Sequence, residues 1–263
     1  MRLGIGYNLF DGEEILPYSL RSIRAAADHV SVVYQTVSNY GSPCDPGLVP
    51  LLERLRTEGL VDELIAHATQ VGAHPHYNEI AKRNRGLRAA REAGCTHYMS
   101  IDADEVYRPQ QLAWAKDEVE RGDWPGSACL SATYYRSPRF RLVHDDPVYF
   151  PMFFKITPAS RFALNAPFPV LADPTRKMVR GSLRIFERGD VEMQHYSYVR
   201  RDLRIKLTNS VLFRTHHSDE IERFAEHYAL WQPGERALLH GGSSDVLEVE
   251  PLIDFDLEAV AQN

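Results

Sequence analysis

The chain has 263 residues, of which 44% are hydrophobic and 25% are charged, and its formal net charge at pH 7 is -6. These values are typical of a globular protein, so the composition excludes a disordered chain, a collagen and a coiled coil. Its three cysteines form no C-x-x-C pair and no apolar run approaches the roughly 18 residues of a membrane span, so we expect a cytoplasmic protein without a zinc ribbon.

The first hundred residues alternate between strand-like and helix-like patterns. The strand-like runs are residues 3–7, 30–34, 61–66 and 97–101. Apolar residues recur at helical spacing between these runs, and the longest helix is expected over residues 77–93. Strands separated by helices of about 10–17 residues indicate right-handed crossovers, and therefore a mostly parallel sheet.

The pattern changes after residue 125. Residues 128–135, 148–156 and 183–196 look like strands, and the loops between them are irregular and contain proline. We expect these strands to add to the same sheet in antiparallel orientation. Residues 200–231 are predicted to be helical, and residues 232–263 to form a loop-rich acidic tail.

Two aspartates follow the fourth predicted strand, in the sequence Asp102-Ala103-Asp104. Ligands of open α/β sheets bind at the carboxyl ends of the strands, where the first and fourth strands can end side by side. Carboxylates at such a place suit Mg²⁺ or Mn²⁺, which complete their shell with phosphate oxygens and water. A capped turn is the structural alternative. The preceding helix carries Lys82 and Arg83, which could reach a diphosphate or a base.

Several of these segments together resemble family-2-type glycosyltransferases. The segments are Tyr7-Asn8, Glu13-Glu14-Ile15-Leu16, Leu20-Arg21-Ser22-Ile23, Lys82-Arg83-Asn84-Arg85-Gly86-Leu87 and Ile101-Asp102-Ala103-Asp104-Glu105. The resemblance covers about the first 110 residues, with the departure that residues 9–12 stand between Asn8 and Glu13. It implies a GT-A type fold, which is a Rossmann-like mixed sheet flanked by helices, with antiparallel additions in the second half.

The resemblance also assigns roles to individual residues. Asp102 would contact the ribose or the sugar of a nucleotide-sugar donor, such as a UDP-sugar or another nucleoside diphosphate sugar. Asp104 would bind a Mn²⁺ or Mg²⁺ ion that bridges the diphosphate. The residues expected to border the nucleotide are Tyr7, Asn8 and Glu14, with Lys82 or Arg83 nearby.

The second half supplies further candidates. His195 follows a strand-like run, and the resemblance makes it a metal ligand. Arg200, Arg201 and Lys206 could hold donor or acceptor phosphates. An inverting transferase also needs a carboxylate that takes the proton of the acceptor. Asp146 is the preferred base and Glu192 a second candidate, while Asp145 and Asp173 stay open.

We therefore expect a transferase domain over residues 1–215, with a nucleotide-sugar-binding half at 1–110 and an acceptor half at 111–215. Residues 216–263 are expected to form a helical, acidic appendage. The predicted function is metal-dependent transfer of a sugar from a nucleotide-sugar to a hydroxyl acceptor, such as a glycan or another soluble molecule.

Two alternatives stay open. Residues 134–217 carry 15 Lys and Arg against 7 Asp and Glu, a net charge of +8, and interleave arginines with aromatic residues. Such a segment is typical of a nucleic-acid surface, so a modified, hydroxylated base in DNA is a second possible acceptor. A non-catalytic protein that binds nucleotides or carbohydrates is the third hypothesis.

Overall fold

The computed structural model describes residues 1–143, 147–178, 182–210, 218–239 and 242–253. The chain divides into two compact units, of which the first comprises residues 1–131 and 147–193 and the second residues 132–146 and 194–263. These boundaries do not coincide with the divisions at residues 110 and 215 that the sequence predicts.

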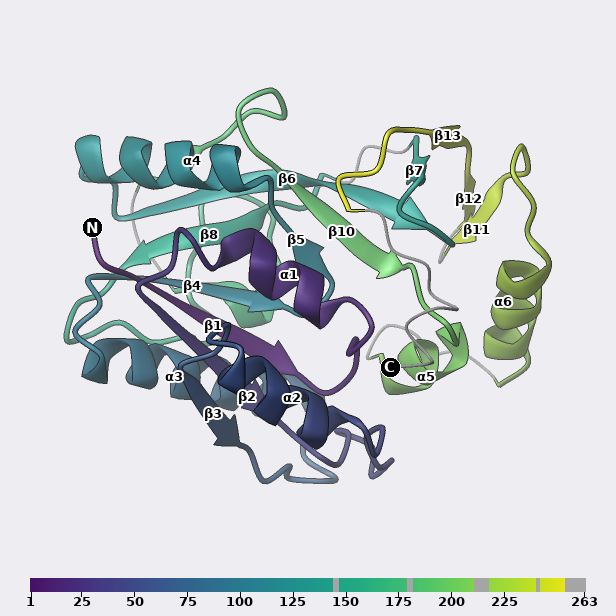
Figure 1. The fold of residues 1–263 in the computed structure, drawn as a ribbon, viewed down its shortest axis with the longest axis horizontal. Helices are drawn as coiled ribbons and strands as arrows, with labels where there is room; N and C mark the ends of the chain where they lie inside the picture. Colours follow the sequence, from purple (N-terminus) through teal and green to yellow (C-terminus); the bar gives the residue numbers. More distant parts are fainter. Residues whose placement is uncertain (144–146, 179–181, 211–217, 240–241, 254–263) are drawn as a thin grey trace. The chain divides into compact units, whose positions relative to one another are not determined.

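The first unit is built on a mixed sheet with the strand order β6-β8-β4-β1-β2-β3 (Figure 1). Its strands are β1 (Leu3–Leu9), β2 (His29–Tyr34), β3 (Glu63–Ala66), β4 (His97–Asp102), β6 (Gly126–Tyr135) and β8 (Phe150–Lys155). Strands β3, β2, β1 and β4 pair in parallel, whereas β8 is antiparallel to both β4 and β6. The predicted α/β class, a parallel half followed by antiparallel additions, is confirmed.

Four helices of this unit cover the two faces of the sheet. They are α1 (Leu16–Ile23), α2 (Leu48–Thr57), α3 (Pro75–Glu92) and α4 (Pro109–Arg121). Apolar residues of α1, α2 and α4 share one buried cluster with Ile5 and Ile101, whereas Leu87 of α3 belongs to another cluster with Tyr98. Because successive strand residues point to opposite faces, the odd-numbered residues of β1 and β4 face α1, α2 and α4, and the even-numbered ones face α3.

Glycines allow α3 to approach the sheet closely. A Cβ atom built on Gly6 or on Gly86 would lie 1.9 Å or 2.3 Å from the Tyr98 hydroxyl, which occupies the space between the helix and the strand. Tyr98 is itself buried, with its ring centroid 6.0 Å from that of Phe162. The position of α3 over β1 and β4 is therefore set by contacts that leave no room for another side-chain atom.

The first unit contains three further short elements, β5 (Glu105–Val106), η1 (Pro174–Arg176) and β9 (Arg184–Ile185). The single strand predicted over residues 183–196 is wrong, because the chain turns between β9 and β10 (Glu192–Tyr198), where Asp190 and Val191 donate backbone hydrogen bonds to the Glu187 carbonyl. Strands β6 and β10 each contain residues of both units.

The second unit has its own apolar core. Its elements are β7 (Phe140–Leu142), α5 (Leu203–Asn209), α6 (Ser218–Leu230), β11 (Ala237–Leu239), β12 (Gly242–Ser244) and β13 (Val246–Glu248). Tyr135, Leu207 and Trp231 are buried in this core. The expectation of a loop-rich tail after residue 232 is wrong for the described residues, because β11 pairs with β12, and β13 pairs with β7.

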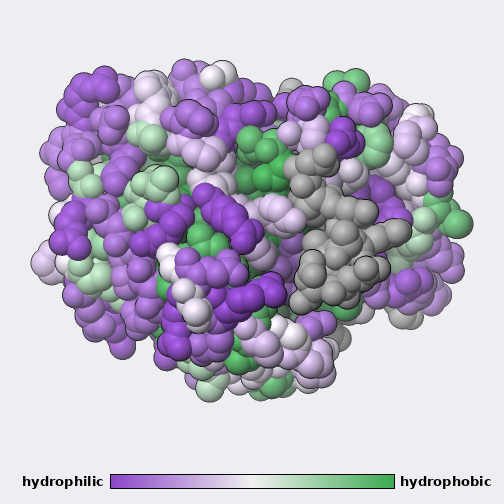
Figure 2. All heavy atoms as spheres, in the orientation of Figure 1, coloured by the Kyte–Doolittle hydropathy of each residue, from purple (hydrophilic) through white to green (hydrophobic). Residues whose placement is uncertain are grey.

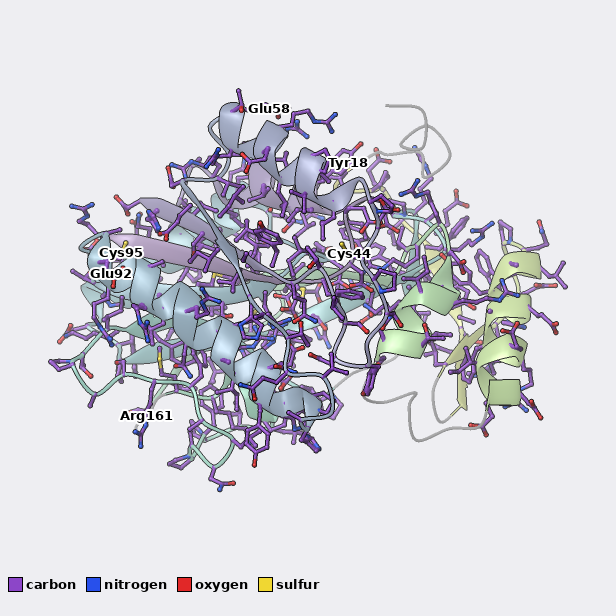
Figure 3. The ribbon with its side chains drawn as sticks, turned by 90° about the horizontal axis from the view of Figure 1, so that it is seen from below. Tyr18, Cys44, Glu58, Glu92, Cys95 and Arg161 are labelled. Atoms are coloured by element: carbon purple, nitrogen blue, oxygen red, sulfur yellow. The ribbon has the colours of Figure 1, made fainter. Side chains whose placement is uncertain are left out.

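Hydrophilic side chains dominate the face shown in Figure 2, and apolar residues appear on it in small patches. Among the described residues, no helix combines the length and the apolar character that crossing a membrane requires. Cys44, Cys95 and Cys129 are free thiols, and Figure 3 shows Cys44 far from Cys95, which lies near the C-terminal end of α3.

Candidate functional site

The end of the parallel sheet brings together two residues that the sequence predicts there. Strands β1 and β4 pair in parallel, and their register places Asn8 opposite Asp102 at the carboxyl ends of both strands. Both positions are even-numbered, so both side chains lie on the face that α3 covers. Asn8 is buried, and Asp102 keeps 34% of its side chain exposed.

Helix α3 supplies the next group of side chains. The helix begins with Pro75 behind a His74 cap, and it places Glu79, Lys82 and Arg83 on the face toward the strands. Residues three and four apart share one face of a helix. The Glu79 carboxylate accepts hydrogen bonds from the amides of Asn8 and Asn39 (3.0 Å for Asn39) and lies 3.5 Å from the Lys82 ammonium.

The charge of Glu79 is stabilised although its side chain is partly buried. Burial by itself would raise the pKa of Glu79, but the nearby Lys82 and Arg83 cations outweigh this effect, and the pKa is lowered. Glu79 is therefore ionised at neutral pH. Its carboxylate orients the side chains of Asn8 and Asn39, whose amide groups donate hydrogen bonds to it.

Two arginines hold the Asp102 carboxylate. Arg83 donates from Nη2 to Oδ1 at 3.2 Å, and its Nη1 donates to the Ser100 hydroxyl at 2.8 Å. Arg176, which follows 74 residues later, donates to Oδ2 from the other side. Burial would raise the pKa of Asp102, but the Arg176 and Arg83 guanidiniums outweigh it, so the pKa lies below its ordinary value.

Arg176 also donates a hydrogen bond to Glu105, which is buried in β5. Burial raises the pKa of Glu105 to about 7, and the opposite effect of Arg176 offsets this only in part. Asp104, in the turn between β4 and β5, is buried beside these groups. We refer to Asn8, Glu79, Lys82, Arg83, Asp102, Asp104, Glu105 and Arg176 as the strand-end cluster.

Several buried polar atoms in and beside the strand-end cluster lack a hydrogen-bond partner. They are Asn8 Oδ1, Gln35 Oε1, Asn39 Oδ1, Arg83 Nε, Glu105 Oε2, Arg176 Nε and Arg176 Nη1. Buried polar groups usually have partners, so these atoms can accept or donate hydrogen bonds to a bound water or ligand. Other buried atoms without a partner lie elsewhere among the described residues, for example Ser131 Oγ and Tyr135 Oη. With four carboxylates and three cations, the cluster suits a ligand that carries both hydroxyl groups and charge.

Not every residue that the sequence predicts to border the nucleotide belongs to the strand-end cluster. Tyr7 is odd-numbered and faces the other layer, where its hydroxyl shares a hydrogen bond of 2.9 Å with Ser19 of α1. Glu14 is buried in the turn before α1. Lys82 and Arg83, with about 2% of each side chain exposed, contact the carboxylates of the cluster and lie beneath its surface.

The candidate residues of the second half lie in different places. Glu192 is buried at the start of β10, where Arg188 donates to its carboxylate at 2.5 Å. His195 and Arg200 belong to the second unit, in which Arg200 is buried and its backbone bonds to the Tyr228 hydroxyl. Asp146 lies outside the described residues.

No protein-family model matches the sequence, and a search of curated proteins finds no match. Solved structures of S. aureus TarS are similar to this chain at low levels of identity. A structure of TarS residues 1–349 with UDP is 11% identical, has a TM-score of 0.49, and is matched over 89% of this chain and 74% of that chain. The complex with UDP-GlcNAc has 12% identity and a TM-score of 0.47 over the same shares.

The chain spans less than half of a longer TarS structure, covering 44% of it with 88% of its own residues, at 12% identity and a TM-score of 0.48. At these values the functional assignment has to come from the chemistry of the strand-end cluster itself.

Three residues of the cluster were not singled out in the sequence, namely Glu79, Glu105 and Arg176. The spacing of Glu79 from Lys82 and Arg83 is a local signal that could have identified it. Glu105 directly follows the predicted aspartate motif. Arg176 has no such signal, because its contact with Asp102 depends on how a distant loop folds.

Proposed function

We propose that the chain is a glycosyltransferase that transfers a sugar from a nucleotide-sugar to a hydroxyl acceptor. The observation that carries the proposal is the register of Asn8 and Asp102 at the carboxyl ends of two adjacent parallel strands, above the charged face of α3. Ligands of open α/β sheets bind at such strand ends.

Each group of the cluster has a role in this proposal. Asp102, whose carboxylate is ionised and partly exposed, would accept hydrogen bonds from ribose or sugar hydroxyls. Asn8 would border the nucleotide. Lys82 and Arg83 are too deeply buried to contact a diphosphate, and we propose that they keep Glu79 and Asp102 charged.

We propose a divalent ion as a partner of the donor. The described residues hold no group of three or more His, Cys, Asp and Glu side chains that could hold a metal ion. Mg²⁺ needs fewer protein ligands, because it is usually held by one or two carboxylates and by substrate phosphates. Asp104 would hold Mn²⁺ or Mg²⁺ here, and the ion would neutralise charge on the leaving diphosphate. His195, the other ligand that the resemblance implies, belongs to the second unit.

The proposed reaction inverts the anomeric carbon. The acceptor oxygen forms a bond to this carbon while the bond from the carbon to the diphosphate breaks, and the acceptor proton passes to a carboxylate base. Asp146 and Glu192 remain the proposed bases. The Glu192 carboxylate can take that role only if its pairing with Arg188 opens or leaves one oxygen for the acceptor.

The DNA alternative draws less support from the charges of the first unit. Arg176 is buried with Asp102 and Glu105, Arg184 lies 4.0 Å from Glu118, and Arg188 pairs with Glu192. Arg176 and Arg188 are closely paired within the protein and add little to a surface that could bind phosphates, whereas Arg184 keeps 30% of its side chain exposed. A free glycan or a small hydroxylated molecule is the acceptor class that we propose.

The decisive experiment is a donor screen with UDP-, GDP-, CDP- and dTDP-sugars, with and without Mn²⁺, that measures nucleotide release. We expect Asp102→Asn to lower the release by about 10–100-fold, because a hydrogen bond to a charged group contributes about 1.5–3 kcal/mol. Asp123→Asn is the matched control, because it removes another ion-paired carboxylate of the first unit, bonded to Lys155 at 2.6 Å. It should leave the release unchanged.

The outcomes separate the hypotheses. Nucleotide release by the wild type that falls by about 10–100-fold in Asp102→Asn and is unchanged in Asp123→Asn supports the transferase. Binding of a nucleotide-sugar without any release favours the non-catalytic alternative, and no binding of any of the four donor classes contradicts the proposal.

A further inference from the structure

The strand-end cluster contains an arginine whose contacts lie in the protein interior. Arg176 ends η1, and its guanidinium bridges the carboxylates of Asp102 in β4 and Glu105 in β5. About 5% of the Arg176 side chain is exposed, against 34% for Asp102 and 1% for Glu105. Of these three groups, Asp102 is therefore the one that a ligand can touch.

Asp102 is held from two directions by cations that are themselves anchored. Arg83 of α3 donates to Asp102 Oδ1 and also to Ser100, which lies in β4 like Asp102. Arg176 donates to Asp102 Oδ2 and also to Glu105. A carboxylate bound on one oxygen can still rotate about its side-chain bonds. A carboxylate whose two oxygens accept hydrogen bonds from different guanidiniums is restricted in that rotation.

The element that delivers Arg176 is also fixed. The Asp173 carboxylate caps η1 by accepting hydrogen bonds from the Thr175 backbone at 2.6 Å and from its hydroxyl at 2.7 Å. The guanidinium carbon of Arg176 lies 5.4 Å from the centroid of the Phe150 ring. These contacts set the place of the guanidinium independently of Asp102.

Glu105 completes the arrangement as the counter-charge of Arg176. A buried guanidinium needs a partner, and Asp102 alone already has Arg83. Glu105 gives the buried Arg176 a second hydrogen-bond acceptor, and it balances the guanidinium charge when it is ionised. The pair therefore orients Asp102 and leaves its exposed edge for a ligand.

We infer that Arg176, with Glu105 as its counter-charge, is a positioning residue that holds the Asp102 carboxylate in the orientation in which it meets the donor. This inference rests on the proposed function for the identity of the ligand, but the orientation of Asp102 is a property of the protein alone. The two parts can therefore be tested separately.

The test is a paired variant, Arg176→Met with Glu105→Gln, which removes both buried charges together. Removal of a whole buried pair is tolerated far better than removal of one partner. The matched control is Lys116→Met with Asp28→Asn, a pair with 3.2 Å between its charged atoms in the same unit, where Asp28 bonds to the first residue of β1. Both variants are first checked by circular dichroism for an unchanged fold.

Two measurements follow, a crystal structure of each variant and calorimetric binding of UDP, GDP, CDP and dTDP. We expect the Asp102 carboxylate to change its orientation in the double variant of Arg176 and Glu105 but not in the control. The nucleotide that the wild type binds most tightly should bind to the double variant about 10–100-fold more weakly. Arg176→Lys should restore part of the affinity, because an ammonium keeps the charge without the planar fork.

An Asp102 carboxylate that keeps its orientation in the folded Arg176 variant would overturn the inference, whatever the affinities are. A displaced Asp102 with undiminished nucleotide binding would overturn its link to the donor. If the wild type binds none of the four nucleotides, the proposed function fails, and the crystal structures still decide whether Arg176 positions Asp102.

Discussion

The contact of α3 with the sheet gives a prediction whose magnitude follows from the structure. A Cβ atom on Gly86 would lie 2.3 Å from Tyr98 Oη, 3.4 Å from Tyr98 Cζ and 3.6 Å from the Gly6 Cα atom. The clash in Gly86→Ala is thus with the hydroxyl oxygen alone, and Tyr98 is too deeply buried to move away. Overpacking of this kind costs about 1–3 kcal/mol.

The substitution Tyr98→Phe removes the clashing atom. In that background Gly86→Ala meets a ring carbon at an ordinary contact distance, and it should stabilise the protein by about 1 kcal/mol because alanine favours a helix over glycine. The weak hydrogen bond from the Tyr98 hydroxyl to the Arg83 carbonyl, at 3.5 Å, is lost in both proteins that carry Tyr98→Phe, so its effect cancels. The double-mutant cycle should therefore give a coupling of about 1–3 kcal/mol.

Urea unfolding of the four proteins, followed by circular dichroism, measures this coupling. Gly6→Ala serves as the control, because its Cβ would still lie 2.8 Å from Tyr98 Cζ and 3.0 Å from Cε2, so Tyr98→Phe should rescue it only in part. Effects of Gly86→Ala and Tyr98→Phe that add within about 0.5 kcal/mol would refute the steric argument. Equal rescue of Gly6→Ala would refute it as well.

Two further predictions concern pH. The pKa of Glu105 is raised from 4.5 to about 7, so the folded protein binds this proton more tightly than the unfolded chain does. The wild type should therefore lose stability relative to Glu105→Gln as the pH rises from about 4.5 to 7, and paired urea titrations measure this difference. For Asp28, burial would raise the pKa, but the backbone N–H of Leu3 and the ammonium of Lys116 lower it. Its stabilising effect should be present above its ordinary pKa of 3.8 and decline as pH falls, so the wild type and Asp28→Asn should converge in melting temperature in acid.

The parts of the fold that repeat a pattern could be predicted from the sequence. Long helices such as α3 and the buried parallel strands have enough residues for their periodicity to be recognised. The alternation of Ile5 and Tyr7 with Gly4 and Gly6 in β1 even indicates which face the helix approaches closely. The short strands β11, β12 and β13 have three residues each, too few for alternation to distinguish them from loops.

The candidate site likewise contains residues that could be predicted from the sequence and residues that could not. Asp102 and Asn8 were predictable because each lies at or directly beside the carboxyl end of a recognisable strand, and the carboxyl ends of parallel strands share one edge. Tyr7 was expected beside them, but neighbouring strand residues face opposite sides, and Tyr7 belongs to the other layer. The roles of Lys82, Arg83 and Arg176 depend on burial and on distant partners, which spacing along the chain does not reveal.

The position of β8 in the sheet has a consequence for synthesis on the ribosome. Strand β8 pairs with the edge of β4, but it is translated about 50 residues after β4 ends. At roughly 5–20 residues per second, that edge waits about 3–10 s for its neighbour. During this interval the nascent chain presents the unpaired backbone of His97 and Tyr98, and an open strand edge of this kind is a template for wrong pairing. The first half of the chain is therefore most exposed to aggregation before its antiparallel partner emerges.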